Sequence, residues 1–151
     1  MKTNFILLWS EKTKKEPRNP FKQSSYQDLF SDYILRAGKF SPATVKVMAR
    51  EEFKSIKGTL WLCDTSPSAK MLTSEALAKK IENAQVHGVS TLNIAIGPHD
   101  GFCDEERKRA DWLWSFGALT LPHELAAVIA SEQIYRAWTI IKRHPYHLGH
   151  K

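Results

Sequence analysis

Apolar and polar positions along the chain follow two periodicities, one typical of helices and one typical of strands. Helical spacing of apolar residues predicts helices at residues 25–38, 74–87 and 122–142, and the charge order after Asp104 predicts a shorter one. Apolar or alternating runs predict strands at residues 5–9, 43–48, 59–63, 91–96 and 115–121. Strands that alternate with helices indicate an α/β protein with a doubly wound, mostly parallel sheet.

Turns that follow the strands of such a sheet are the usual place for a ligand. The turn at residues 97–101, GPHDG, has glycines that let the backbone approach a ligand closely, although an ordinary strand-to-helix turn has the same composition. Residues 117–122, GALTLP, suit either an apolar slot for a flat ring or a plain strand end with a helix cap. We therefore expect any ligand to bind near the turns after residues 63, 96 and 121.

The last predicted helix carries apolar residues over more than one narrow stripe. A helix that is apolar on two sides is buried by more than one neighbour. In a small protein the second neighbour is often another subunit, so the pattern favours a homodimer.

The length of 151 residues, of which 42% are hydrophobic, suits one domain that spans residues 1–151. Apolar runs such as residues 5–9 are far shorter than a membrane span or a signal-peptide core. We therefore expect a soluble, cytoplasmic protein with no membrane partner. Cys63 and Cys103 lie far apart without a CxxC spacing, which argues for reduced thiols and against a zinc site.

Positive charge is concentrated in two segments of a chain whose formal net charge is +6. Residues 11–22 form a proline-bearing basic loop with a net charge of +3. The end of the chain from residue 136, which includes a basic tail at residues 142–151, has a net charge of +4. The remaining residues have a net charge of −1. Clustered cations beside polar and aromatic groups favour a polyanion such as RNA, because phosphate contacts release counterions. A solvated basic terminus has the same composition, so charge alone leaves both interpretations open.

Motifs of several common enzyme classes are absent from the sequence, among them GxGxxG, GxxxxGK[ST], GxSxG and HExxH. Histidines recur at every third residue from His144 to His150, but a proline and a glycine interrupt any helix there and no carboxylate or thiol lies nearby. We therefore expect no bound metal. Arg143, Tyr146 and His147 better suit phosphate and base contacts with RNA, with a frayed terminus as the alternative.

Three motifs in the last third of the chain carry a specific resemblance. They are WSFGALTLPH at residues 114–123, EQIYRAW at 132–138 and HPYH at 144–147. Together they closely resemble the ribosomal large-subunit pseudouridine N3-methyltransferase family, which belongs to the SPOUT class of methyltransferases. The resemblance is specific over residues 91–147, loose over residues 60–88 and poor before them.

This resemblance implies a doubly wound α/β fold with a C-terminal trefoil knot, a homodimer, and S-adenosyl-L-methionine bound at the knot. It implies three loops around the cofactor, which are the same three turns that the sheet topology selects. The cofactor-binding residues implied in this way are Cys63, Asp64, Ile96, Gly97, Pro98, Gly101, Gly117, Ala118, Leu119, Thr120, Leu121 and Pro122.

The implied reaction is transfer of a methyl group to N3 of a pseudouridine in large-subunit ribosomal RNA. The ring nitrogen must lose its proton before it becomes a good nucleophile. We therefore expect His144 and His147 to accept the proton and Arg136 to stabilise the anion or hold a phosphate. Substrate contacts are expected from His123, Arg143 and Tyr146.

The chain departs from the family at positions that bear on function. Pro98 stands where the family usually has a second glycine, and proline removes an amide donor that would serve the cofactor. Ala127 stands where the family usually has an arginine, and residues 49–58 are too few for much of a family helix. The alternatives to methylation of the ribosome are therefore another RNA target, or a non-catalytic SPOUT-like protein that binds RNA or the ribosome.

Overall fold

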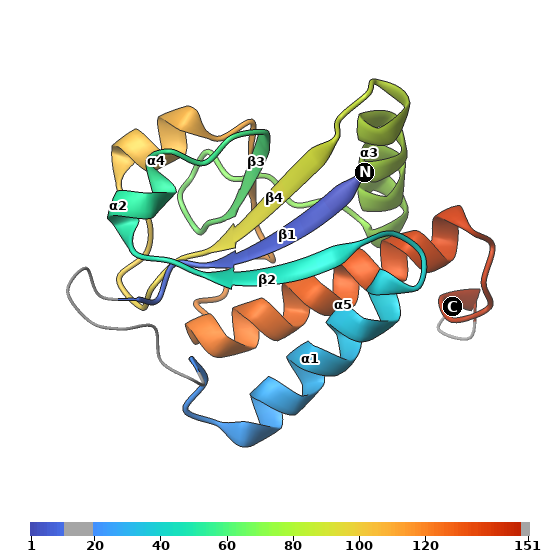
Figure 1. Ribbon diagram of the computed structural model, residues 1–151, viewed down its shortest axis with the longest axis horizontal. Helices are drawn as coiled ribbons and strands as arrows, with labels where there is room; N and C mark the ends of the chain where they lie inside the picture. The colour runs from blue at the N-terminus through green and yellow to red at the C-terminus, as the bar shows by residue number, and fades with distance from the viewer. Residues whose placement is uncertain (11–19, 149–151) are drawn as a thin grey trace.

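Five parallel strands form one sheet in the computed structural model, which describes residues 1–10 and 20–148. The strand order in these residues is β2 (Ala43–Val47), β1 (Lys2–Leu7), β4 (Thr91–Ile96), β3 (Thr59–Cys63) and β5 (Trp112–Trp114). The helices are α1 (Ser24–Gly38), α2 (Arg50–Phe53), α3 (Ser74–Val86), α4 (Asp104–Arg109) and α5 (His123–Ile141) (Figure 1). The predicted α/β fold with a parallel sheet is confirmed.

Alternation of side chains along the strands builds a separate apolar cluster on each face of the sheet. Phe5 and Leu7 of β1 belong to the larger cluster, which α1, α3 and α5 cover. Ile6 points to the other face, where it joins a smaller cluster with Phe53 of α2 and Phe102. Both faces are therefore covered, which explains why burial along the central strands is continuous rather than alternating.

The apolar sides of α5 are covered by elements of the same chain. α1 and α3 both pack against α5, and the sheet lies against its inner side (Figure 1). Ala127, Ala137 and Trp138 are almost completely buried in this way. The prediction that more than one neighbour buries α5 is therefore confirmed, with neighbours from the same chain, while the homodimer stays a prediction. Ala127 is a packing residue in the core.

Element boundaries agree with the sequence pattern in the middle of the chain and differ at its ends. The predicted strand at residues 115–121 is wrong, because β5 ends at Trp114 and the following residues form a loop. Ser115 Oγ accepts a hydrogen bond from Gly117 N at 3.1 Å, and Gly117 has a φ of 119° that favours glycine. Pro122 is the N-cap of α5 rather than its first helical residue. β1 also ends at Leu7, which leaves Trp9 outside the strand.

The predicted basic loop at residues 11–22 lies largely outside the described residues, as do residues 149–151 of the tail. What the structure describes of the loop is its end. The main-chain N–H groups of Lys22 and Gln23 donate to Oε1 of the buried Glu124 at 3.0 and 3.1 Å, so this end is attached to the first turn of α5.

Candidate cofactor pocket and tail cluster

A cavity lies at the carboxyl ends of β3 and β4, where three loops converge on the first turn of α5. Its volume is about 200 Å³. Pockets that enclose a drug-sized ligand commonly measure about 300–1,000 Å³, so this protomer alone would enclose part of such a ligand. We call this cavity the cofactor pocket.

Ten of the twelve residues that the sequence assigns to the cofactor line this pocket. They come from the turn after β3, the turn after β4 and the loop before α5, which confirms that the three turns meet. Ala118 and Pro122 belong to the same last loop but are not part of the lining. The lining residues from the assigned set are Cys63, Asp64, Ile96, Gly97, Pro98, Gly101, Gly117, Leu119, Thr120 and Leu121.

The turn after β4 is packed closely against the residues behind it. A Cβ on Gly97 would lie 3.2 Å from the Phe102 ring, and the Gly97 carbonyl accepts a hydrogen bond from Trp9 Nε1 at 3.0 Å. Gly101 has a φ of 82°, and its N–H donates to the Pro98 carbonyl at 2.8 Å. Gly97 therefore permits the close approach of Phe102, and Gly101 permits the tight turn. The close approach of this backbone to a ligand stays a prediction.

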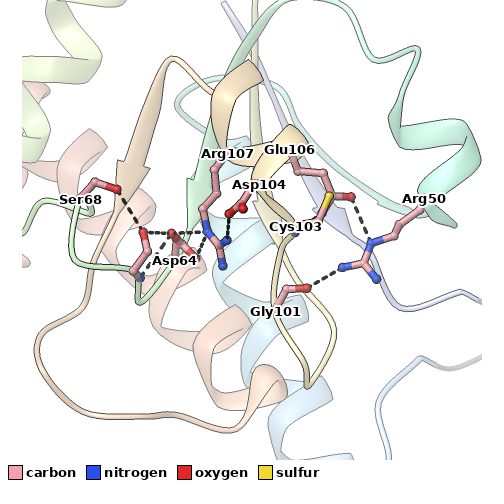
Figure 2. A network of polar contacts seen from close by, with 9 residues as sticks. Arg50, Asp64, Ser68, Gly101, Cys103, Asp104, Glu106 and Arg107 are labelled. Carbon is pink, nitrogen blue, oxygen red and sulfur yellow. Dashed lines mark hydrogen bonds and ion pairs between the residues drawn. The ribbon is translucent and has the colours of Figure 1, made fainter.

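A carboxylate at the wall of the pocket is held by an arginine that sequence reasoning missed (Figure 2). Asp64 is 7% exposed, and its Oδ2 lies 3.1 Å from Arg107 Nε. Arg107 Nη1 also contacts Asp104 Oδ1 at 2.9 Å, and the Ser66 hydroxyl donates to Asp64. Arg107 lines the pocket, so a buried negative group and a cation face it together. The basic last turn of α4 was visible in the sequence, but its position over β3 was not.

His123 also lines the pocket, at the start of α5. Its ring packs edge-to-face on Trp9 with centroids 4.7 Å apart. Partial burial lowers the pKa of His123, an effect that Glu124 opposes and that His99 and Lys22 reinforce. The imidazole is therefore neutral at pH 7, where one ring nitrogen can accept a hydrogen bond.

Cys63 lines the pocket but is not a nucleophile in this arrangement. Burial, with a smaller contribution from Asp64, raises the pKa of the Cys63 thiol far above neutrality. The thiolate is the reactive form of cysteine, so Cys63 stays protonated and contributes packing.

The predicted catalytic residues gather in a second place, at the C-terminal end of α5. Arg136 Nη1 donates to His147 Nδ1 at 3.0 Å, and His147 Nε2 donates to Glu75 Oε1 at 2.5 Å. Arg136 also forms an ion pair with Glu132 at 2.8 Å. We call Glu75, Glu132, Arg136, Tyr146 and His147 the tail cluster.

Tyr146 fixes the tail to α5. Its ring packs edge-to-face on Tyr135 with centroids 4.7 Å apart, and the Arg136 guanidinium lies 4.8 Å from the centroid of the same ring. Its hydroxyl donates to Glu132 Oε2 at 2.7 Å. Burial and the Glu132 carboxylate raise the pKa of Tyr146, so the phenol stays a donor. His144 is close by, and its Nδ1 accepts the Tyr146 N–H at 3.2 Å. Arg143 is exposed, with a φ of 58°.

The cofactor pocket and the tail cluster lie at opposite ends of α5 within one chain. Arg136 lies thirteen positions after His123 in one continuous helix, which is about 20 Å at 1.5 Å per residue. In Figure 1 the far end of α5 lies on the opposite side of the molecule from the loop after β4. The structure thus brings most of the predicted cofactor residues together and the predicted catalytic residues together, but not the two sets with each other.

A search for groups of three or more histidine, cysteine, aspartate or glutamate side chains able to hold a metal ion finds none in residues 1–10 and 20–148. Within the same residues, no helix has both the length and the apolar character needed to cross a membrane.

Comparison with known proteins identifies the class to which this fold and pocket belong. A family described as "Predicted SPOUT methyltransferase" matches residues 19–147. The chain belongs to the SPOUT methyltransferase family, and the resemblance expected from the tail motifs is confirmed.

Similar proteins with assigned names are ribosomal RNA methyltransferases. Ribosomal RNA large subunit methyltransferase H of Koribacter versatilis (strain Ellin345) is 35% identical over 152 residues, which cover 95% of this chain and 97% of that protein. The protein of the same name from Rhodospirillum centenum (strain ATCC 51521 / SW) is 37% identical over 136 residues, which cover 80% of this chain and 88% of that protein. The alignment with the first of these runs over nearly the full length of both chains.

Solved structures with little sequence identity share the fold. TrmJ from Z. mobilis ZM4 superposes with a TM-score of 0.54 at 10% identity, covering 93% of this chain and 69% of that one. A probable methylase family protein from Haemophilus influenzae Rd KW20 superposes with a TM-score of 0.56 at 14% identity, and the match covers 95% of this chain and 69% of that one. At these identities the likeness concerns the fold alone.

Proposed function

We propose that this chain is an S-adenosyl-L-methionine-dependent methyltransferase of large-subunit ribosomal RNA, with N3 of a pseudouridine as the methylated atom. The observation that carries the proposal is the convergence of the three expected loops around one pocket with a buried carboxylate. Family membership and the names of the relatives support the reaction and the ribosomal substrate. A ribosomal substrate places the reaction in the cytoplasm.

The residues present fit this cofactor chemically. S-adenosyl-L-methionine carries a positive sulfonium and an amino-acid end with both an ammonium and a carboxylate. Asp64 offers a buried negative group and Arg107 a positive one, both on the pocket wall and 3.1 Å apart. Opposite charges at this spacing match the two ends of an amino-acid group. The apolar side chains of Ile96 and Leu121 supply a surface for a flat ring.

The bound cofactor would supply an electrophilic methyl group, and the residues of the chain do the remaining work. The loops at residues 97–101 and 117–121 orient the ligand, which makes the transfer effectively unimolecular. Arg136 stabilises the negative charge of the deprotonated base. His147 Nδ1 takes the N3 proton once Arg136 turns from it toward the substrate, and His144 is the second candidate acceptor.

A homodimer belongs to the same proposal, because a single protomer does not bring the two sets of residues together. Family membership supports a C-terminal trefoil knot as a further part of it. The tail cluster lies about 20 Å from its own pocket along α5, and the pocket encloses only part of a ligand. A partner's tail placed at the pocket would complete the site. His123, Arg143 and Tyr146 are then the candidate contacts to RNA.

The direct test is transfer of a labelled methyl group from S-adenosyl-L-methionine to ribosomes, large subunits and protein-free ribosomal RNA. We expect incorporation into large-subunit RNA, at a pseudouridine that mass spectrometry identifies as methylated on N3. Binding of the cofactor without transfer to any of these would refute the ribosomal substrate. Transfer to a different RNA would establish a retargeted enzyme.

Asp64→Asn should weaken S-adenosyl-L-methionine binding by about tenfold or more, because it removes a hydrogen-bonded charge from the pocket wall. Asp104→Asn is the matched control, since Asp104 contacts the same arginine but its side chain is 90% exposed. Calorimetric titration with S-adenosyl-L-methionine and S-adenosyl-L-homocysteine measures both. If both variants bind S-adenosyl-L-methionine with equal affinity, Asp64 does not contribute to cofactor binding.

The second candidate function is a non-catalytic RNA-binding protein of the same family. Pro98 favours it, since this position has no N–H to offer a ligand. Such a protein would bind ribosomal RNA with a steep dependence on salt and would not bind S-adenosyl-L-methionine. The calorimetric titration of the unmodified chain discriminates the two functions.

A further inference from the structure

A short helix that the sequence pattern did not predict stands behind the turn at residues 97–101. Arg50, the first residue of α2, reaches Gly101 at the end of this turn (Figure 2). Its Nη2 donates to the Gly101 carbonyl at 2.6 Å, and its Nε donates to Glu106 Oε2 at 3.2 Å. One planar guanidinium thus bridges the end of the turn and the helix that follows it.

Glu106 connects the arginine back to the start of α4. Its other oxygen, Oε1, accepts a hydrogen bond from the main-chain N–H of Cys103 at 2.8 Å. The Glu106 side chain is 10% exposed and that of Arg50 is 42% exposed, so solvent partly screens the ion pair between them. Arg50 therefore holds residues 101–106 at two points.

Apolar packing between α2 and Phe102 also supports the same turn. The Phe53 ring of α2 stacks on the Phe102 ring with centroids 6.2 Å apart, and Phe102 in turn contacts Gly97. Both ends of α2 are thus in contact with the segment from Gly97 to Glu106. Arg50 itself is not among the residues that line the cofactor pocket.

The turn needs such support because of its composition. Gly101 is free to adopt many backbone conformations, and the structure holds it at a φ of 82°. Pro98 offers no N–H through which a ligand could help to order the turn. A loop that must be ordered at the moment of binding loses affinity through conformational entropy, whereas an ordered loop does not.

We propose that Arg50 is a positioning residue for the cofactor: it holds the turn at residues 97–101 in its ligand-binding shape through the Gly101 carbonyl and Glu106. The inference rests on the proposed function, because the ligand is S-adenosyl-L-methionine. Arg50 acts on affinity through the turn, because it is not among the residues that line the cofactor pocket.

The experiment compares Arg50→Ala with Lys54→Ala in the full chain. Lys54 is the C-cap residue of the same helix, and its replacement by alanine removes the same positive charge. Its ion pair, however, is with the exposed Glu51 rather than with the turn. We expect Arg50→Ala to raise the KM for S-adenosyl-L-methionine about tenfold and to leave kcat within about twofold, because one charge-assisted hydrogen bond to the turn is lost. Arg50→Lys should recover part of the loss, since a lysine keeps the charge but not the fork.

Amide hydrogen exchange without cofactor provides a second readout. The Gly101 N–H donates to the Pro98 carbonyl, and its exchange should accelerate in Arg50→Ala but not in Lys54→Ala. Equal KM values and equal Gly101 exchange in the two alanine variants would overturn the inference while the proposed function stands. Failure of the unmodified chain to bind S-adenosyl-L-methionine would overturn both. A fall in kcat and thermal midpoint, without a selective change in KM, would assign Arg50 a purely structural role.

Discussion

Removal of residues 144–151 should lower the rate of methyl transfer by about 100-fold or more, because it removes the candidate proton acceptors together with Tyr146. The affinity for S-adenosyl-L-methionine should stay within about twofold, since none of the residues that line the pocket belongs to the tail, and the tail is assigned to the RNA substrate. Single-turnover methyl transfer to large ribosomal subunits measures the first quantity, and calorimetric titration measures the second.

Point variants in the tail separate its chemistry from its length. Tyr146→Phe keeps the ring on Tyr135 but removes the hydroxyl that donates to Glu132, so it should show a smaller loss than the truncation. Leu148→Ala is the control, because this side chain is 60% exposed. Activity that survives the truncation unchanged would contradict the roles assigned to His144, Tyr146 and His147.

Trp138→Ala should destabilise the protein by about 3–5 kcal/mol, a large part of the roughly 5–15 kcal/mol by which most domains are stable. Trp138 is 1% exposed and is the largest fully buried side chain of the described residues. It lies in the cluster that joins α5 to the sheet, so its removal leaves a cavity where the helices meet. Urea unfolding followed by circular dichroism gives the change in free energy.

Val86→Ala is the matched control for this experiment. Val86 is the last residue of α3 and is 76% exposed, so its truncation should change stability by no more than about 0.5 kcal/mol. Unfolding midpoints that coincide for the two variants would mean that α5 is not packed as described. The loss of stability in Trp138→Phe should lie between those of Trp138→Ala and Val86→Ala, because phenylalanine fills part of the cavity.

Sequence patterns predicted the buried centre of the sheet well. β3 and β4 begin and end where the apolar runs at residues 59–63 and 91–96 do. Gly88, just past the predicted helix at residues 74–87, has the positive φ expected of a helix end. These signals are local, since each run is bounded by turn residues within a few positions.

Features that depend on residues distant in the sequence could not be predicted from local sequence patterns. The residues 112–114 form β5 because they pair with β3, some 50 residues earlier, while the apolar residues after them line the pocket instead. Arg107 and Arg50 each sit in short charged segments, and only the fold places one on Asp64 and the other on Gly101. The three cofactor loops were predictable because the parallel sheet topology itself brings them to one edge.

The continuous helix α5 fixes the register between its two ends in a way that a loop would not. Each inserted or deleted residue would shift the tail by about 1.5 Å along the axis and rotate it by about 100° relative to His123. Such a change between His123 and Glu132 would rotate Arg136 and the tail together and would carry His147 away from Glu75 in the first turn of α3. The segment between residues 123 and 136 is therefore a molecular ruler, and viable variants of this chain should differ in length in their loops while keeping this number of helical residues constant.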